Sequence, residues 1–326
     1  MIFDSQPCLA LEYSNMKGDV ACLGIIVADL ITKPVEILPE KGKLSLVKNI
    51  QLHTGGCATN TGFALARLGL EVAILGKVGK DGLGNFIFQQ AKSIGINTTG
   101  LIQDGQDDTS ATIVMVSQEG ERSFLHCLGA NAKYNLNDID FTLIKRYKIL
   151  HYAGGLLLPK LDGKPIAALL KRAKSCGIVT SFDTAWDATG RWLKVLEPVL
   201  SHLDIFLPSI DEAKMITGKK SPEEITSFLL KYGIKIIGLK MGEKGCFLRK
   251  RGENGIYIPA LPVKAVDTTG AGDAWVAGFL TGFIQGWPLE KIGRFANGVG
   301  ALSTLSFGAT GGVKSLEETL KFANLL

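Results

Sequence analysis

Short apolar runs alternate with helical patterns along most of this chain, and that alternation limits the fold more than any other feature. The run VACLGIIVADLI predicts a first strand, CATNTGFALARLG predicts a helix that ends at Gly69, and VAILGKVG predicts the next strand. The alternation continues through KILHYAGG, KPIAALLKRAKSCG, IVTSFD and IKIIGLK. Continuous apolar strands between amphipathic helices indicate βαβ units. The sequence therefore predicts an α/β fold: a mostly parallel central sheet flanked by helices on both faces.

Two segments, residues 33–52 and 109–128, interrupt this rhythm. The second contains TSATIVMVSQEGERSFLHC, which alternates on both sides of a Glu119-Gly120 turn and is typical of a hairpin. Strands inserted between βα units do not easily join a parallel sheet, so we expect a small separate β-layer. It can act as a lid over the site, as a flap that forms a homodimer, or as both. The expected division is a core of 19–32, 53–108 and 129–326, a lid of 33–52 and 109–128, and an extension of 1–18.

Composition excludes several classes of protein. The 326 residues are 46% hydrophobic and 21% charged, which is typical of a globular chain that buries a large core. The net charge of +5 is spread along the chain, so no nucleic-acid partner is predicted. No run approaches the ~18 uncharged apolar residues of a membrane span. The first residues lack the basic and apolar regions of a signal peptide, so we expect a cytoplasmic protein. The six cysteines never form C-x-x-C, so no zinc site is predicted.

The segment AVDTTGAGDAWVAGFLTGFIQG carries the strongest chemical signal. A turn rich in Thr and Gly leads directly into a long apolar helix, so Gly270, Ala271 and Gly272 lie at a helix N-terminus. Unpaired N–H groups and the helix dipole make such a turn an anion site. Asp273 would repel that anion, but it is well placed to accept a proton from a hydroxyl that attacks a phosphate. The alternative is that Asp273 only complements the dipole and the glycines only permit close packing.

A second group of residues suits a polyhydroxy ligand. In HTGGCATNTG, the pair Gly55-Gly56 precedes a helix that carries Asn60 in its first turn, and Asn offers both a donor and an acceptor. Asp29 is predicted to end the first strand, where the carboxyl edge of a parallel sheet borders a ligand crevice. The structural alternatives are a helix cap for Asn60 and a turn for Asp29. The chain has neither a G-x-x-x-x-G-K-[ST] phosphate loop nor the G-x-G-x-x-G of a dinucleotide site.

Together, GGCATNTGFALARLG with VGKDGLG and DTTGAGDAWVAGF resemble the two signature regions of the PfkB (ribokinase-like) carbohydrate kinase family. The resemblance covers the chain from about Asp19 to its C-terminal helix. It implies a ribokinase-like fold with a small β-sheet lid, and ATP-dependent phosphorylation of a hydroxyl, expected to be primary, on a small sugar or sugar derivative. It further implies Asp273 as general base, Gly270 to Gly272 as anion hole, and sugar binding by Asp29, Gly56 and Asn60.

The same resemblance implies a nucleotide site and its cofactors. The sequence KMGEKGCF would put Lys240, Gly242 and Gly245 beside the phosphates and ribose, and FANGVGALS would put Asn297 and Ala301 near the adenine. An N-x-x-E pattern helps to organise Mg²⁺ and phosphate in the family. Here it reads Ser209-Ile210-Asp211-Glu212, so Glu212 is kept and Ser209 would act through its hydroxyl or water. Asp267 and Thr269, with backbone near Gly308, resemble the family's site for a monovalent cation such as K⁺.

Departures from the family pattern bear on the acceptor. Ribose kinases carry an Asn and a Lys where this chain has Val27 and Cys57, which argues against ribose. Fructokinases and 2-keto-3-deoxygluconate kinases have a D-x-N-x-R run ahead of Leu-Trp. Here SFDTAWDATGRWL keeps Asp183, Arg191 and Trp192 but not the Asn or the spacing, which suggests an altered sugar pocket. Arg122 on the expected lid either meets an anionic group of the substrate or is a solvated charge.

Two alternative functions remain open at this point. A nucleoside kinase of the same superfamily would need an acceptor pocket lined by aromatic side chains. A catalytically silent sugar-binding regulator is the other, and the complete GAGD sequence argues against it. A dinucleotide-dependent oxidoreductase shares the fold class but lacks its glycine fingerprint here.

Overall fold

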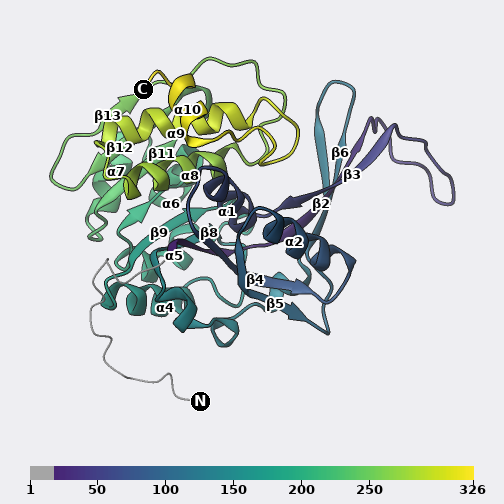
Figure 1. The fold of residues 1–326 in the computed structure, drawn as a ribbon, viewed down its shortest axis with the longest axis horizontal. Helices are drawn as coiled ribbons and strands as arrows, with labels where there is room; N and C mark the ends of the chain where they lie inside the picture. The colour runs from purple at the N-terminus through teal and green to yellow at the C-terminus, as the bar shows by residue number, and fades with distance from the viewer. Residues whose placement is uncertain (1–17) are drawn as a thin grey trace.

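The computed structural model describes residues 18–326, and their main body is a nine-stranded sheet with helices on both faces (Figure 1). The strand order is β13-β12-β11-β10-β9-β8-β1-β4-β5. Neighbours are parallel from β11 to β5, and β12 and β13 are antiparallel at one edge. The bounds are β1 Gly18–Gly24, β4 Val72–Gly79, β5 Asn97–Asp104, β8 Tyr147–Gly155, β9 Val179–Thr184, β10 Ile205–Phe206, β11 Ile236–Lys240, β12 Cys246–Lys250 and β13 Ile256–Ile258. The predicted mostly parallel α/β sheet is confirmed.

Each face of this sheet has its own apolar core, because successive side chains of a strand point to opposite faces. In β1, Ala21 and Leu23 belong to one core, and Val20 and Cys22 belong to the other. Helices α3 to α7 cover the first core, and α1, α2 and α8 to α10 cover the second. Their bounds are α1 Cys57–Arg67, α2 Gly82–Ser93, α3 Phe141–Ile144, α4 Lys164–Ser175, α5 Trp192–Leu200, α6 Ile210–Thr217, α7 Pro222–Leu230, α8 Ala271–Ile284, α9 Leu289–Ser303 and α10 Leu316–Phe322.

The first apolar run is not one strand, and here the sequence-based expectation is wrong. β1 ends at Gly24, and the chain starts a new strand, β2 Val27–Lys33, in a different sheet. β1 is paired on both sides, by β4 and β8, whereas β2 pairs with strands of the small sheet. Asp29 therefore lies within the small sheet and not at the carboxyl edge of the large one. An unbroken apolar run carries no signal for such a change of sheet.

The small sheet has four strands in the order β3-β2-β6-β7, and it projects from one side of the main body (Figure 1). The remaining bounds are β3 Asn49–Gly55, β6 Ala111–Val116 and β7 Arg122–Cys127. β6 and β7 are antiparallel neighbours that join through the predicted turn at Glu119-Gly120. The separate β-layer is thus confirmed, and it begins earlier and ends later than residues 33–52 suggested. We call this four-stranded sheet the lid sheet; its action as a lid stays a prediction.

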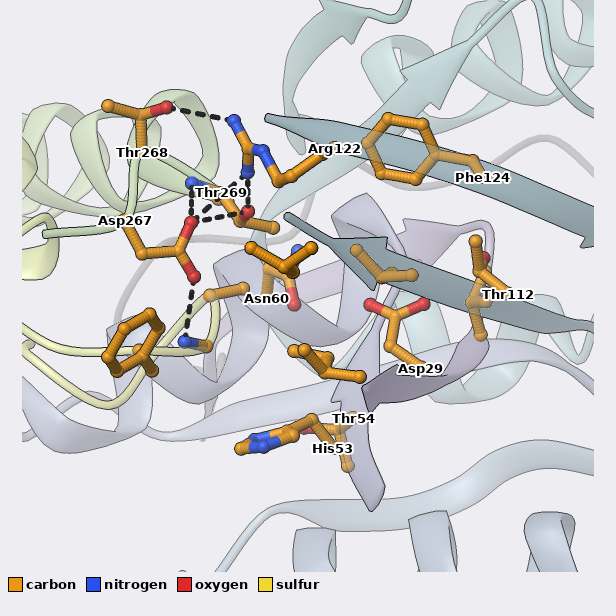
Figure 2. A pocket seen from close by; sticks show the side chains of 18 of the residues that line it. Asp29, His53, Thr54, Asn60, Thr112, Arg122, Phe124, Asp267, Thr268 and Thr269 are labelled. Atoms are coloured by element: carbon orange, nitrogen blue, oxygen red, sulfur yellow. Dashed lines mark hydrogen bonds and ion pairs between the residues drawn. The ribbon is translucent and has the colours of Figure 1, made fainter. Parts of the chain in front are cut away.

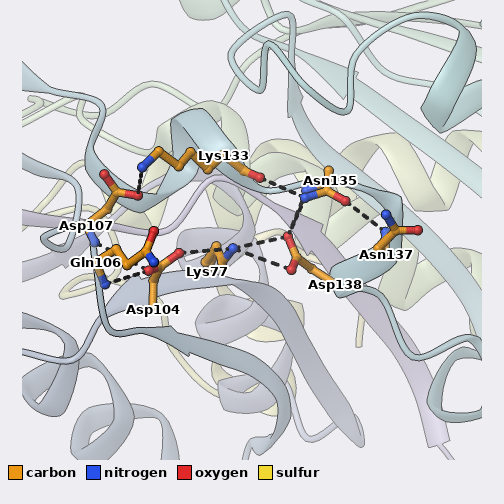
Figure 3. Close-up of polar contacts among 8 residues, drawn as sticks. All are labelled: Lys77, Asp104, Gln106, Asp107, Lys133, Asn135, Asn137 and Asp138. Carbon is orange, nitrogen blue, oxygen red and sulfur yellow. Dashed lines mark hydrogen bonds and ion pairs between the residues drawn. The ribbon is translucent and has the colours of Figure 1, made fainter.

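A buried ion-pair cluster fixes the chain just before it enters the lid sheet (Figure 3). Lys77, near the end of β4, has its Nζ 3.1 Å from Asp104 Oδ2 on β5 and 3.3 Å from Asp138 Oδ2. Burial opposes the charge of Lys77, but these two carboxylates outweigh it and raise the lysine's pKa. Lys133 and Asp107 add a further ion pair of 2.6 Å. Paired charges therefore hold the segment between β5 and β6 at its start, Asp104, and at its middle, Asp107.

No helix within residues 18–326 is both long enough and apolar enough to cross a membrane.

Candidate active site

Two cavities meet at the N-terminus of α8. The first lies between the lid sheet and the core, and Gly270 and Asp273 line it. The second lies on the other side of the same turn, and Ala271 and Gly272 line it. Thr268 borders both cavities. The turn therefore presents free helical N–H groups between two places where ligands can bind.

The backbone conformation of this turn requires glycine. Gly270 is the N-cap of α8 and has φ 71°, in the left-handed region. A Cβ added there would lie 2.5 Å from Ala309 Cβ and 2.8 Å from Ala309 Cα. Any side chain would consequently push the turn away from the loop that follows α9. The helix itself is apolar on all sides because it is buried, packed against α1 and α9.

Asp273, in the first turn of α8, is buried beside polar groups from other elements. Asn60 on α1 donates from Nδ2 to Asp273 Oδ2 at 2.8 Å. Burial raises the pKa of Asp273, although Asn60, Lys240 and Cys57 act in the opposite direction. Asn60 Oδ1 is buried and finds no donor within residues 18–326. A hydroxyl that enters the first cavity can supply that donor, which brings it close to the Asp273 carboxylate.

The lid sheet turns a polar row of side chains toward the first cavity. Asp29 on β2 lies opposite His53 on β3 and Thr112 on β6, and Thr112 lies opposite His126 on β7. All four side chains line the cavity. Burial raises the pKa of Asp29 to about 6, against the effect of its hydrogen bond with Thr112. Gly55 makes room for this carboxylate, since a Cβ there would lie 2.0 Å from Asp29 Oδ2.

The next row of the lid sheet is largely apolar. Ile31 lies opposite Val114, and Val114 lies opposite Phe124. These three side chains line the cavity together with Phe307, from the loop after α9. The cavity is thus polar near Asp273 and apolar farther out. A ligand that fits it carries hydroxyl groups at one end and presents a face without charge at the other.

At the outer row, Arg122 crosses from β7 to the loop before α8 (Figure 2). Its Nη1 lies 3.1 Å from Asp267 Oδ1, its Nη2 donates to Thr268 Oγ1 at 3.2 Å, and Nη1 also contacts the Thr269 hydroxyl. Lys33 makes a parallel contact from β2, with its Nζ 3.4 Å from the centre of the Phe307 ring. The sequence left open whether Arg122 is a solvated charge or meets an anionic group of the substrate. In this conformation the exposed guanidinium is paired with Asp267 and is not free for an anionic ligand.

Asp267 is fully engaged. Its Oδ1 accepts from the backbone N–H and the hydroxyl of Thr269 as well as from Arg122, and its Oδ2 accepts from the Gly308 N–H. The predicted monovalent-cation residues therefore lie together. In this conformation Arg122 balances the charge of Asp267, so a monovalent cation would have to replace that ion pair.

The second cavity contains the residues that the sequence predicted for a nucleotide. Ser209, Lys240, Gly242, Gly245, Asn297 and Ala301 all line it. Gly245 has φ 94°, and a Cβ there would lie 2.0 Å from the Ile258 carbonyl oxygen. Asn297 donates to the carbonyls of Ile258 and Pro259 and accepts from Trp275 Nε1. Both amide hydrogens of Asn297 are therefore in use, and the residue shapes this cavity without offering a free donor.

Glu212 and Ser209 have a structural role at the start of α6. The Ser209 hydroxyl accepts from the Glu212 N–H at 3.3 Å, and Glu212 Oε2 accepts from the Ser209 N–H at 2.9 Å. Thr184 also donates to Glu212 Oε2, at 2.9 Å. Both bonds that the carboxylate accepts reach Oε2, so Oε1 is left for a water of a hydrated ion, although Glu212 does not itself line the second cavity. A single carboxylate suits Mg²⁺, which binds largely through phosphates and water.

Sequence reasoning missed residues that only the folded chain brings together. Thr112, His126 and Phe124 carried no motif, and their role in the cavity follows from strand register. Asp183 was predicted to belong to a sugar pocket, but it does not line the first cavity and pairs with Lys240 at 2.6 Å. Arg191 is bound to Asp187 and to the Leu156 carbonyl. The alternation of Asp29, Ile31 and Lys33 was the one signal that could have identified the polar and apolar rows.

A buried carboxylate beside a helix N-terminus, between two cavities, is an arrangement that suits the transfer of an anionic group between two ligands. Comparison with known proteins identifies the class. A model described as pfkB family carbohydrate kinase matches residues 17–324, so the chain belongs to that family. It is accordingly a sugar kinase, and the expected family resemblance is confirmed.

Individual relatives agree with this assignment. A protein described as an uncharacterized sugar kinase, from Archaeoglobus fulgidus, is 31% identical over 250 residues, which cover 76% of this chain and 97% of that one. A ribokinase from Haemophilus influenzae is 27% identical over 316 residues, 94% of this chain and 99% of that one. The structure of Arabidopsis thaliana ribokinase complexed with ribose and ATP has a TM-score of 0.80 at 24% identity, covering 94% and 99% of the two chains. The ribokinase-like fold is therefore confirmed.

Proposed function

We propose that this enzyme transfers the γ-phosphoryl group of ATP to a hydroxyl, expected to be primary, of a small uncharged sugar or sugar derivative. The observation that supports this most directly is the position of Asp273, buried where the two cavities meet and hydrogen-bonded to Asn60. Asp273 accepts the proton of the acceptor hydroxyl, whose oxygen then bonds to the γ-phosphorus. The bond from that phosphorus to the bridging oxygen breaks, and ADP leaves.

The N-terminus of α8 stabilises the charge that develops during this transfer. The N–H groups of Gly270 and Gly272, which have no backbone acceptor within residues 18–326, and the positive end of the helix dipole would face the phosphoryl group. The Ala271 N–H donates to the Thr268 carbonyl oxygen at 3.2 Å and would join this anion hole by sharing that hydrogen bond. We assign Lys240, Gly242 and Gly245 to the phosphates and ribose, and Asn297 and Ala301 to the wall near the adenine. Mg²⁺ bound to the phosphates, with Glu212 holding its water, would neutralise further charge. A monovalent cation such as K⁺ would bind at Asp267 and Thr269 once Arg122 has left Asp267.

The acceptor binds in the first cavity, with Asp29, Gly56 and Asn60 around its hydroxyl groups. A carboxylate such as Asp29 accepts two hydrogen bonds from a diol. The apolar row of Ile31, Val114 and Phe124 favours an uncharged remainder. Arg122 is occupied by Asp267, so an anionic acceptor would have to break that ion pair first.

One alternative acceptor has an observation in its favour. Phe124 and Phe307 both line the outer part of the cavity, and aromatic rings there suit a nucleobase. A nucleoside is therefore the second candidate.

A coupled assay of ADP release over pentoses, hexoses, keto-acids and nucleosides tests the proposal. We expect ADP release to rise with uncharged sugars and not with keto-acids. Stimulation by nucleosides alone would favour the nucleoside candidate. Sugar binding without ADP release would instead identify a silent regulator.

Acceptor affinity should fall in acid as Asp29 takes up a proton. Its pKa is raised by burial to about 6, so the carboxylate is ionised above that pH and protonated below it. If only the carboxylate binds, Kd rises about tenfold for each pH unit below 6. Equilibrium binding to D273N enzyme measures this without the titration of Asp273. The double variant D29N/D273N should bind the acceptor weakly, with a Kd that does not change with pH. A Kd of the D273N enzyme that stays constant between pH 5 and 7 would exclude this role of Asp29.

The lid sheet supports a homodimer, because its outer face is also apolar. Leu30 lies opposite Leu52 and Ile113, and Ile113 lies opposite Leu125. Leu125 is 54% exposed and Ile113 is 42% exposed. A contiguous exposed apolar face marks an interaction site. The double variant I113E/L125E should convert a dimer of 34.9 kDa chains to monomers in light scattering, while E119K at the hairpin tip should not. A wild-type monomer would contradict the proposal.

A further inference from the structure

A buried lysine and a buried aspartate pair across the carboxyl edge of the large sheet. Lys240, the last residue of β11, donates from Nζ to Asp183 Oδ1 on β9 at 2.6 Å. Their side chains are 12% and 3% exposed. β10 lies between these strands but is only two residues long, Ile205–Phe206, so the lysine reaches its partner beyond the end of β10.

This pair lies directly against the turn that forms the proposed anion hole. A Cβ added at Gly272 would be 3.6 Å from Lys240 Nζ. Lys240 lines the second cavity, whereas Asp183 is not among the described residues that line either cavity. Asp183 accordingly lies behind Lys240, which is its hydrogen-bonded route to the second cavity, and its charge also acts on Asp273.

The ammonium group needs such a partner. Burial alone would favour neutral Lys240, but Asp183 and Glu212 outweigh burial and raise the pKa of the lysine. The other titratable groups around it are Asp273 on α8, Cys57 on α1 and His151 on β8. Burial raises the pKa of the Cys57 thiol well above its usual value and lowers that of His151 to about 3, so neither titrates near neutral pH.

We propose that Asp183 is a positioning residue for phosphoryl transfer: it holds the Lys240 ammonium against the first turn of α8, aimed at the phosphate that binds there. This inference rests on the function proposed above. An ammonium has three donors, and Asp183 takes one of them, which leaves two for phosphate oxygens. Asp183 also fixes the direction of the flexible four-carbon side chain of Lys240. Fewer conformations of that side chain then have to be lost when the phosphate binds.

A double-mutant cycle tests whether Asp183 acts through Lys240. D183N keeps the shape of the side chain and removes its charge. We expect D183N to lower kcat about 10- to 100-fold, with the KM for ATP changed less than about threefold, because the interaction is strongest in the transition state. In a K240M background the same change should cost less than about twofold, since the partner is already gone. An equal cost in both backgrounds would overturn the proposal.

The pH profile gives a second readout that a purely structural role would not move. Without Asp183, Lys240 should lose its proton at lower pH, so D183N should lose activity on the alkaline side where the wild type does not. In D183N/K240R this alkaline loss should vanish, because a guanidinium does not titrate. A D183N profile that matches the wild type would contradict the assignment.

Asp204 provides a matched control. It is a buried carboxylate with Lys235 at 3.0 Å and Lys174 at 3.3 Å, and it lies at the opposite, amino end of β10. D204N should lower thermal stability while leaving kcat and the pH profile unchanged. Should D183N alone not fold, D183N/K240M removes both buried charges and is compared with K240M. Absence of wild-type turnover would refute the proposed function itself, whereas wild-type turnover with an unaltered D183N would refute only the positioning role.

Discussion

Replacement of Asp273 by asparagine is expected to lower kcat by about 10²- to 10⁴-fold, the usual contribution of a general base. An asparagine fills the same space and can still accept the hydrogen bond of Asn60, but it cannot take a proton from the acceptor. Binding of ATP and of the acceptor should change little, because neither depends on that proton transfer. Steady-state kinetics with calorimetric binding of both ligands measure the two effects separately. A near-normal kcat in D273N would show that another group is the base.

The pH dependence of kcat in the wild-type enzyme also tests whether Asp273 is the base. The pKa of Asp273 is raised by burial, so the carboxyl group stays protonated to a higher pH than an ordinary aspartate. Only the ionised form can accept a proton, and kcat should therefore fall on the acid side at a pH above the usual range for Asp. The acid loss should be absent from the residual activity of D273N.

Replacement of Gly270 by alanine is expected to have the second-largest effect. The new Cβ would meet Ala309 at 2.5 Å and would hold an L-residue at φ 71°, so the turn must move. Misplacing donors that face the transferring group costs about 10²- to 10³-fold in kcat. The strained backbone itself should cost about 1–3 kcal/mol of stability. Kinetics and thermal unfolding of the same preparation measure both losses.

Gly286, just past the other end of α8, provides a control that distinguishes backbone strain from displacement of the anion-binding turn. It has φ 68°, nearly the same as Gly270, but no atom lies within 4 Å of an added Cβ. G286A should therefore lose stability comparable to the strain alone and keep its kcat. Equal kinetic losses in the two variants would mean that the position of the anion-binding turn is unimportant.

The sequence predicts those parts of the site that are local in the chain. Gly270 of the turn and Asp273, the proposed base, are three residues apart, and the helix that follows is recognisable from its apolar composition. Gly242 and Gly245 are likewise part of one short turn. Each of these features is decided by neighbouring residues, so backbone conformation and helix position follow directly from the local pattern.

Contacts between distant segments could not be predicted in this way. Lys240 and Asp183 are 57 residues apart, and Arg122 and Asp267 are 145 residues apart. Their pairing depends on sheet order and on the angle at which the lid sheet meets the core. Asp29 was assigned to the wrong sheet for the same reason: periodicity reports which residues are buried, and not which strand will be their neighbour.

Successive side chains of a lid strand point to opposite faces of the lid sheet, so the residues of the two faces can be substituted independently. Asp29, Ile31 and Lys33 face the cavity, while Leu30 and Thr32, between them, face away. Substitutions at positions 29, 31 and 33 can change which acceptor binds and leave the opposite face unchanged. Substitutions at positions 30 and 32 can change the opposite face and leave the cavity unchanged. An insertion of a single residue in β2 would exchange the two sets at once. Diversification of this enzyme class should therefore proceed through point substitutions in these strands, with length changes confined to the loops that connect them.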